Sequence, residues 1–157
     1  MTHELFLALL GFAFVTSVTP GPNNMMLLAS GVNFGLRRTL PHMLGISVGH
    51  SLMVFVLGLG VAGAIQTSPR AGVVLKVVSV GYMLWLAWKI AHAAAPGEGK
   101  EAAQPMTFLQ AAAFQWVNPK AWAMALTAVS AYVAVPSVAA YAAVAGVFAL
   151  VNLPSIT

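Results

Sequence analysis

Two proline-containing segments, each inside a long apolar run, carry the chemically useful backbone of this sequence. The first is residues 19–24 (TPGPNN), and the second is residues 118–120 (NPK). Proline lacks an amide hydrogen and clashes with the preceding helical turn, and the residue before it is driven toward extended backbone. We therefore expect both helices to be interrupted, with backbone amides and carbonyls left free.

Such breaks suit a zwitterionic amino acid, which needs partners for one carboxylate and one ammonium group. Amides at a helix N-terminus attract a carboxylate, and unwound carbonyls together with asparagine amides could hold the ammonium. The same asparagines could instead only satisfy backbone groups that the prolines leave open. The residues predicted to bind substrate are Thr19, Pro20, Gly21, Pro22, Asn23, Asn24, Asn118, Pro119 and Lys120.

Two titratable side chains lie inside apolar runs. Lys120 follows the second break, where a membrane-buried charge indicates a functional site; it could attract a carboxylate or change protonation during transport, or it could reach out to the membrane interface. His50 could be linked to proton movement, although such a histidine is more often a satisfied hydrogen-bonding group. The three acidic residues lie outside these runs and exclude a carboxylate relay in this part of the chain. They are Glu4, Glu98 and Glu101.

Several kinds of chemistry have no residues to support them. The sequence has no cysteine, which excludes disulfides, thiolate metal sites and cysteine nucleophiles. It shows no nucleophile with a base, no metal-ligand cluster, no paired carboxylates and no phosphate-binding loop. We predict no catalytic residue, no metal, no cofactor and no enzymatic activity. The seven Lys and Arg residues are scattered, which argues against a nucleic-acid partner.

The composition places these residues in a membrane. Of 157 residues, 60% are apolar and 6% are charged, against about 25% charged in ordinary soluble domains. A membrane-crossing helix needs about 20 mostly apolar residues, and four or five runs are long enough. We predict an all-α, polytopic transmembrane helix bundle with about five helices. The runs cover residues 5–28, 40–65, 72–95 and 108–135, and a fifth begins near Ser137 and continues to Thr157.

The two breaks lie at matching places in the chain. Residues 14–20 (FVTSVTP) align with residues 114–119 (FQWVNP), each about fifteen residues into the first segment of a three-segment unit. Interrupted helices at corresponding positions indicate a transporter built from inverted repeats. We predict a single transporter domain over residues 1–157, with a first repeat of about 1–95, a linker of about 96–107 and a partial second repeat of 108–157. A complete protein would have 3+3 helices, so the chain is expected to be incomplete.

Basic residues suggest how the helices are oriented, since Lys and Arg favour cytoplasmic loops. Four flank the first and third connections, and two flank the second. We therefore expect the first and third connections in the cytoplasm and the N-terminus outside. The four are Arg37, Arg38, Lys89 and Lys100, and the two are Arg70 and Lys76.

Glycines at four-residue spacing provide small surfaces on which membrane helices approach closely. We predict that these glycines serve helix packing. They are Gly31, Gly35, Gly45 and Gly49.

Taken together, these motifs resemble the lysine exporter (LysE/RhtB) family of amino-acid efflux proteins. The resemblance rests on residues 19–23 (TPGPN), 31–38 (GVNFGLRR), 45–49 (GISVG), 118–120 (NPK) and 152–154 (NLP). It implies a secondary transporter that exports amino acids or close derivatives from the bacterial cytoplasm across the inner membrane, driven by the proton motive force. The expected partners are an amino-acid substrate and the lipid bilayer, with homo-oligomerisation left open. The alternative is a membrane assembly or structural subunit, or an inactive fragment, that transports nothing.

Overall fold

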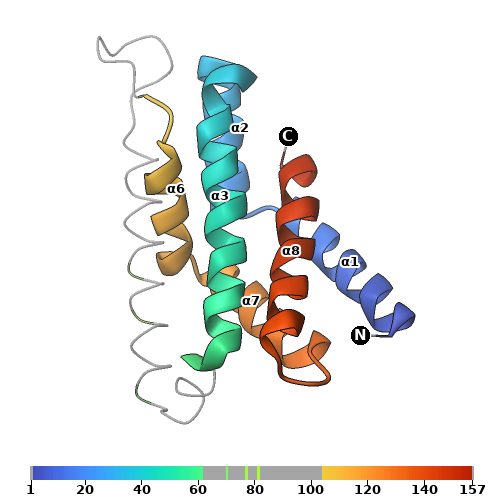
Figure 1. The fold of residues 1–157 in the computed structure, drawn as a ribbon. Coiled ribbons are helices and arrows are strands. Elements are labelled where there is room, and N and C mark those ends of the chain that lie inside the picture. Colours follow the sequence, from blue (N-terminus) through green and yellow to red (C-terminus); the bar gives the residue numbers. More distant parts are fainter. Residues whose placement is uncertain (1, 62–69, 71–76, 78–80, 82–103, 157) are drawn as a thin grey trace.

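A computed structural model describes residues 2–61, 70, 77, 81 and 104–156, and the continuous stretches among them are helical (Figure 1). The third predicted run, residues 72–95, and most of the linker lie outside the described residues. The helices are α1 (His3–Val18), α2 (Pro22–Phe34), α3 (Leu36–Val56) with a π-helical end η1 (Leu57–Val61), α6 (Phe108–Phe114), the 3-10 turn η2 (Gln115–Val117), α7 (Pro119–Tyr132) and α8 (Val138–Ser155).

The first predicted run is broken where the prolines stand. Helix α1 ends at Val18, and Thr19 takes an extended conformation, as the residue before a proline does. Helix α2 begins with Pro22, a position where a proline costs no hydrogen bond. The two helices are bent by 56°, and the pair has the length and composition of one broken membrane span or of a re-entrant loop. The predicted interruption is confirmed.

The second break has the same construction. Helix α6 starts with a capping box between Thr107 and Gln110 and ends after seven residues. The 3-10 turn η2 follows, Asn118 is extended, and Pro119 opens α7. With 7 and 14 residues, α6 and α7 are each shorter than the roughly 20 residues that a membrane span needs. This predicted interruption is also confirmed.

Within residues 2–61 and 104–156, two helices are long and apolar enough to cross a membrane unbroken: Leu36–Gly60 and Val138–Ser155. The first of them begins earlier than the expected residue 40. Gly35 alone makes the turn after α2, with a φ of 76° that glycine adopts without strain. Arg37 and Arg38 therefore belong to the first turn of α3 rather than to a loop.

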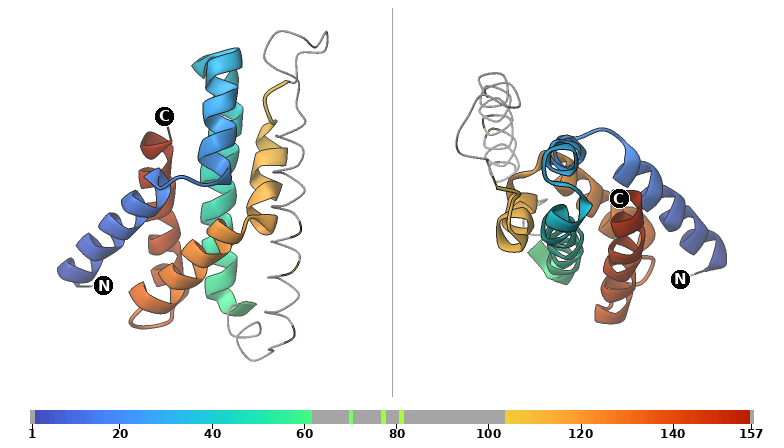
Figure 2. Two further views of the ribbon diagram at one scale, coloured as in Figure 1. Left: turned by 180° about the vertical axis from the view of Figure 1, so that it is seen from behind. Right: turned by 90° about the horizontal axis from the view of Figure 1, so that it is seen from above.

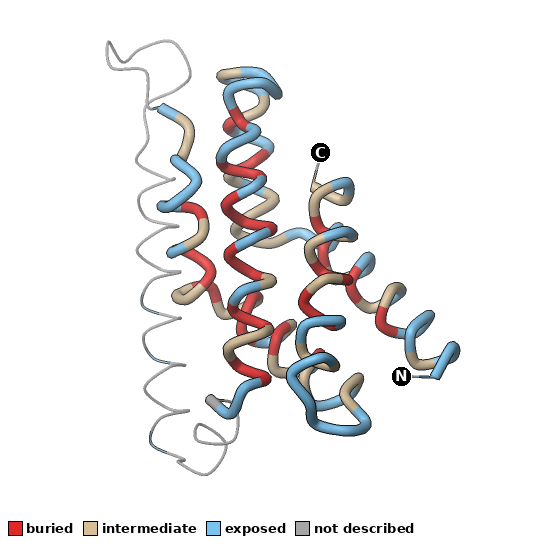
Figure 3. The backbone as a smooth tube through the Cα atoms, viewed as in Figure 1, coloured by how far each residue is buried: buried red, intermediate tan, exposed pale blue. Residues whose placement is uncertain are grey.

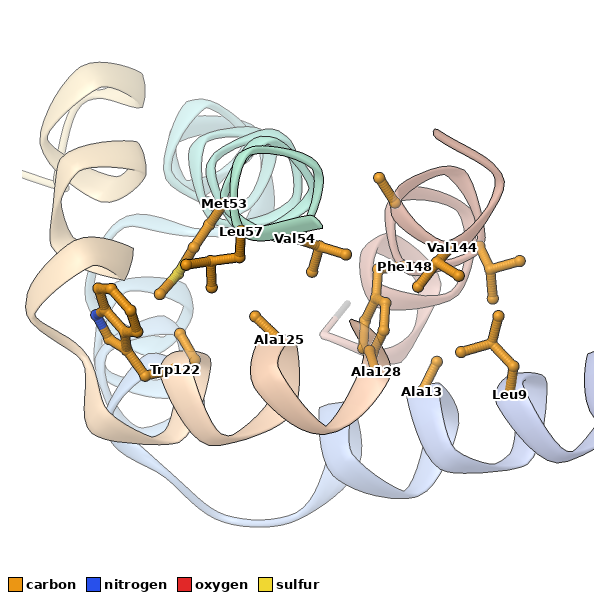
Figure 4. Close-up of a cluster of buried hydrophobic side chains, with 13 residues drawn as sticks. Leu9, Ala13, Met53, Val54, Leu57, Trp122, Ala125, Ala128, Val144 and Phe148 are labelled. Carbon is orange, nitrogen blue, oxygen red and sulfur yellow. The ribbon is translucent and has the colours of Figure 1, made fainter. Parts of the chain in front are cut away.

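Helix α3 occupies the middle of the described structure, in contact with α2, α6, α7 and α8, while α1 extends away from it and lies against α8 and α7 (Figure 2). Buried residues follow the inner face of α3 along its length (Figure 3). A hydrophobic core joins α1, α3, α7 and α8 (Figure 4). Its largest buried members include Leu9, Met53, Leu57 and Phe148.

Two of the four predicted packing glycines lie at a close helix contact. A Cβ added to Gly45 would lie 2.3 Å from the carbonyl oxygen of Phe108, and one added to Gly49 would lie 2.5 Å from Cα of Ala112. These glycines let α3 and α6 approach closely, as predicted. Among the described residues no atom lies within 4 Å of a Cβ built at Gly31 or Gly35, so the packing role of these two glycines stays a prediction. Gly35 also makes the turn between α2 and α3.

The first connection and the end of the linker lie at the same end of the bundle. Phe34 and Arg38 line one surface cavity together with residues 104–108, and α2 and α6 share this end in Figure 1. The side of the membrane that these connections face stays a prediction.

Candidate functional site

Both helix breaks open onto one small cavity. Its volume is about 20 Å³, which is room for about one water molecule. Six of the predicted site residues line it: Gly21, Asn23, Asn24, His50, Asn118 and Lys120. The lining also contains Thr16, Ser17, Gln115, Ala121, Met124, Asn152 and Ile156.

The other predicted site residues shape the breaks rather than the wall of the cavity. Pro22 and Pro119 each open the helix that follows a break. Thr19 and Pro20 form the exposed turn between α1 and α2. The backbone carbonyl of Thr19 accepts a hydrogen bond from Lys120, which follows the second break.

A pair of side-chain amides joins the two breaks. Asn23 donates from Nδ2 to Oε1 of Gln115 at 2.9 Å, and Gln115 donates from Nε2 back to Oδ1 of Asn23 at 3.2 Å. The same Nε2 also donates to the carbonyl of Ala111 at 3.0 Å. Gln115 is fully buried, so this reciprocal pair fixes two segments that are far apart in the sequence.

The other two asparagines satisfy backbone groups near the prolines. Asn24 donates from Nδ2 to the carbonyl of Ser17 at 3.0 Å and to that of Thr19 at 3.3 Å, at the C-terminus of α1. Asn118 accepts at Oδ1 from the amide of Lys120 at 3.1 Å and so caps α7. The backbone-satisfying role that the sequence left open is therefore present.

Lys120 crosses from the second break to the first. Its Nζ donates to the backbone carbonyl of Thr19. The lysine stem passes directly over Gly21, where an added Cβ would lie 2.7 Å from Cδ of Lys120. Because Gly21 has no side chain, the stem of Lys120 can occupy this space.

His50 reaches the same cavity from α3. The side chain is 2% exposed, and its ring stands edge-on to Phe148 with the centroids 5.0 Å apart. Its Nε2 has no hydrogen-bond partner among the described residues. His50 is thus placed at the site, and its link to proton movement stays a prediction.

Sequence reasoning missed three buried polar residues of the cavity wall, namely Ser17, Gln115 and Asn152, and the half-buried Thr16. The three buried ones lie inside apolar runs. Polar residues at membrane depth tend to face a bundle interior or a cavity, and that signal could have identified them. Asn152 contributed to the family resemblance without being assigned to the site.

The electrostatic character of the cavity is simple. Helix N-termini, which are positive ends of helix dipoles, approach it from α2 and α7, and the negative C-terminus of α1 lies beside them. Lys120 adds the one charged side chain among the described lining residues, and no carboxylate is among them. The charges and dipoles of the lining match a small molecule with one anionic and one cationic group, and the cavity must widen to admit it.

Comparison with known proteins agrees with this chemistry. A family model described as "LysE type translocator" matches residues 14–153. The cysteine/O-acetylserine efflux protein of Klebsiella pneumoniae subsp. pneumoniae is 35% identical over 133 residues, which cover 85% of this chain and 67% of the relative. The protein of the same name in Escherichia coli (strain K12) is 34% identical over 134 residues, covering 85% and 68%. No solved structure matches the chain significantly.

Proposed function

Because this chain belongs to the LysE-type translocator family, we propose that it exports small amino acids through the cavity between its two helix breaks. The family is one of multi-pass transport proteins of the bacterial inner membrane, not of enzymes. The proposal concerns which atoms of this chain meet the substrate, and which substrates they accept.

The contact between Lys120 and Thr19 carries the proposal. It joins a cation from the second break to a carbonyl at the end of α1. A zwitterion can insert between these two groups, since its carboxylate pairs with the Lys120 ammonium and its own ammonium takes over the Thr19 carbonyl. In the structure both groups are held in place by pairing with each other.

The start of α2 supplies further donors for the carboxylate. Gly21 provides no side-chain cap, and Pro22 has no amide hydrogen. The amides of Asn23 and Asn24 have no acceptor within the helix, and both residues line the cavity. A carboxylate at this position meets the positive end of the α2 dipole as well as Lys120.

We also propose that the chain contains one inverted repeat and part of a second. In each half, a broken helix is followed by a tight reversal into an unbroken helix: α1 and α2 lead into α3, and α6 and α7 lead into α8. The two units run in opposite directions in Figure 1. Inverted repeats that meet at broken helices place a substrate site between them, and the cavity lies at that position.

The substrates we propose are small, uncharged at the side chain, and exported at the expense of the proton motive force. The relatives carry the name cysteine/O-acetylserine efflux protein. The cavity is small and has no carboxylate among its described lining residues, so a basic side chain finds no counter-ion there.

Everted membrane vesicles test the proposal, because export appears in them as uptake. We expect uptake of radiolabelled L-serine that a protonophore abolishes, with competition by O-acetyl-L-serine. L-Serine methyl ester and ethanolamine, which lack the carboxylate, should compete at least about tenfold more weakly, since a hydrogen-bonded charge pair is lost. Equal competition by these amines would refute the insertion between Lys120 and Thr19. No uptake of any amino acid would favour the alternative, a membrane subunit that transports nothing.

A further inference from the structure

Two buried polar atoms in the cavity wall have no hydrogen-bond partner among the described residues. They are Oγ of Ser17 and Nε2 of His50. The side chains are 4% and 2% exposed. A buried polar group without a partner destabilises the fold, and native proteins keep few of them. Both residues line the same cavity, so a small molecule bound there could complete both of them.

The hydroxyl of Ser17 is unpaired although a partner is close in sequence. Serine and threonine in helices commonly donate back to a carbonyl one turn earlier. Thr16 donates in this way to the carbonyl of Phe12 at 2.6 Å, and Thr19 donates to that of Val15. Ser17, between them, does not. Its backbone carbonyl is held by Asn24, so the last turn of α1 is fixed while the hydroxyl remains available to the cavity.

His50 presents its free nitrogen from the opposite helix. One part of its ring packs edge-on against Phe148, which belongs to the hydrophobic core. The residue also lines the cavity. An imidazole nitrogen can donate or accept a hydrogen bond. Ser17 and His50 therefore offer hydrogen bonding of both kinds to a small group in a space of about 20 Å³, roughly the volume that one water occupies.

We propose that Ser17 and His50 form the subsite for the substrate side chain and select a small, uncharged, hydrogen-bonding group such as a hydroxyl. This inference rests on the proposed function, in which Lys120 and the Thr19 carbonyl hold the two charged groups of the amino acid. Substrates that lack the side-chain polar group leave both atoms unpaired, so the site rejects them.

An isosteric substrate pair tests the subsite. L-Serine and L-2-aminobutyrate differ by a hydroxyl in place of a methyl group and have the same charged groups. In everted vesicles we expect the native protein to transport L-serine at least about tenfold faster at equal low concentration. Ser17→Ala and His50→Leu should each reduce this ratio about fivefold.

Ser47→Ala is the matched control. Ser47 is a buried serine of α3 whose hydroxyl donates to the carbonyl of Ala149 at 3.0 Å, outside the cavity. Its removal should leave the ratio unchanged. If His50→Leu fails to reach the membrane, Ser17→Ala decides alone, since it removes a single oxygen atom.

The outcomes separate the two proposals. Transport of both amino acids at equal rates, or an unchanged ratio in Ser17→Ala, overturns the subsite and leaves the proposed function standing. A reduced ratio in Ser17→Ala with an unchanged ratio in Ser47→Ala supports the subsite. Transport of neither amino acid by membrane-inserted protein overturns the proposed function and the subsite with it.

Discussion

Replacing Gly21 with alanine should displace Lys120 without touching the lysine itself. The backbone at Gly21 is extended, with φ of −170° and ψ of 179°, so alanine fits the conformation. Its Cβ, however, would lie 2.7 Å from Cδ of Lys120 and 3.2 Å from Nζ. Since carbon atoms in contact stand about 3.5–4.0 Å apart, the lysine stem must move by about 1 Å, and Nζ leaves the Thr19 carbonyl.

The expected consequence is a weaker site rather than an unfolded protein. A hydrogen bond to a charged group is worth about 1.5–3 kcal/mol, and the half-buried position of Lys120 places this one at the lower end. We expect the KM for L-serine uptake into everted vesicles to rise about tenfold. Gly21 also stands at the N-cap of α2, where alanine costs about 1 kcal/mol, so uptake is normalised to the amount of inserted protein.

Gly31→Ala is the control for this substitution. Gly31 lies on the same helix, and no described atom lies within 4 Å of a Cβ built there. Its KM should stay at the native value. A native KM in Gly21→Ala would refute the proposed role of the Lys120 contact, and an equal rise in both variants would show that alanine in α2 perturbs transport for another reason.

Three further predictions follow from the same structure. Lys120→Met keeps the length of the side chain and should abolish L-serine uptake at normal protein levels; unchanged uptake would remove Lys120 from the site. Pro20→Ala and Pro119→Ala should each lower uptake, because each proline holds the residue before it extended. The double variant should be little worse than either single variant, since both breaks form one site. Near-normal uptake in the double variant would mean that the prolines only bend the helices. Reporter fusions after Arg38 should report the cytoplasm and fusions after Ser68 the outside, and the opposite pattern would reverse the expected topology.

The two helix breaks could be predicted from the sequence because their causes are local. A proline acts on its own turn and on the residue before it, so the positions of Pro20 and Pro119 define both interruptions. The close packing at Gly45 and Gly49 was predictable for a similar reason, since the absence of a side chain is a property of the residue itself. Which helix packs against a given glycine depends on tertiary structure: Gly45 and Gly49 face α6, whereas no described atom lies within 4 Å of a Cβ built at Gly31.

The pairing inside the site depends on tertiary structure. Asn23 and Gln115 are 92 positions apart, and no local pattern relates them. The start of α3 was placed too late, because Arg37 and Arg38 resemble a loop in composition while the positive φ of Gly35 lets a single residue make the turn. Ser17 was missed because an ordinary helical serine satisfies itself locally, and only the structure shows that this one does not.

Substrate protection of a single introduced cysteine tests the central claim most directly, namely that the cavity between the breaks is the substrate site. The chain has no cysteine, so Met124→Cys places one thiol in the cavity wall and Val135→Cys places one in the exposed connection between α7 and α8. We expect O-acetyl-L-serine to slow the reaction of Cys at position 124 with N-ethylmaleimide in a concentration-dependent way and to leave position 135 unaffected. Labelling at position 124 that is indifferent to O-acetyl-L-serine and to L-serine, in a variant that still transports, would contradict the account.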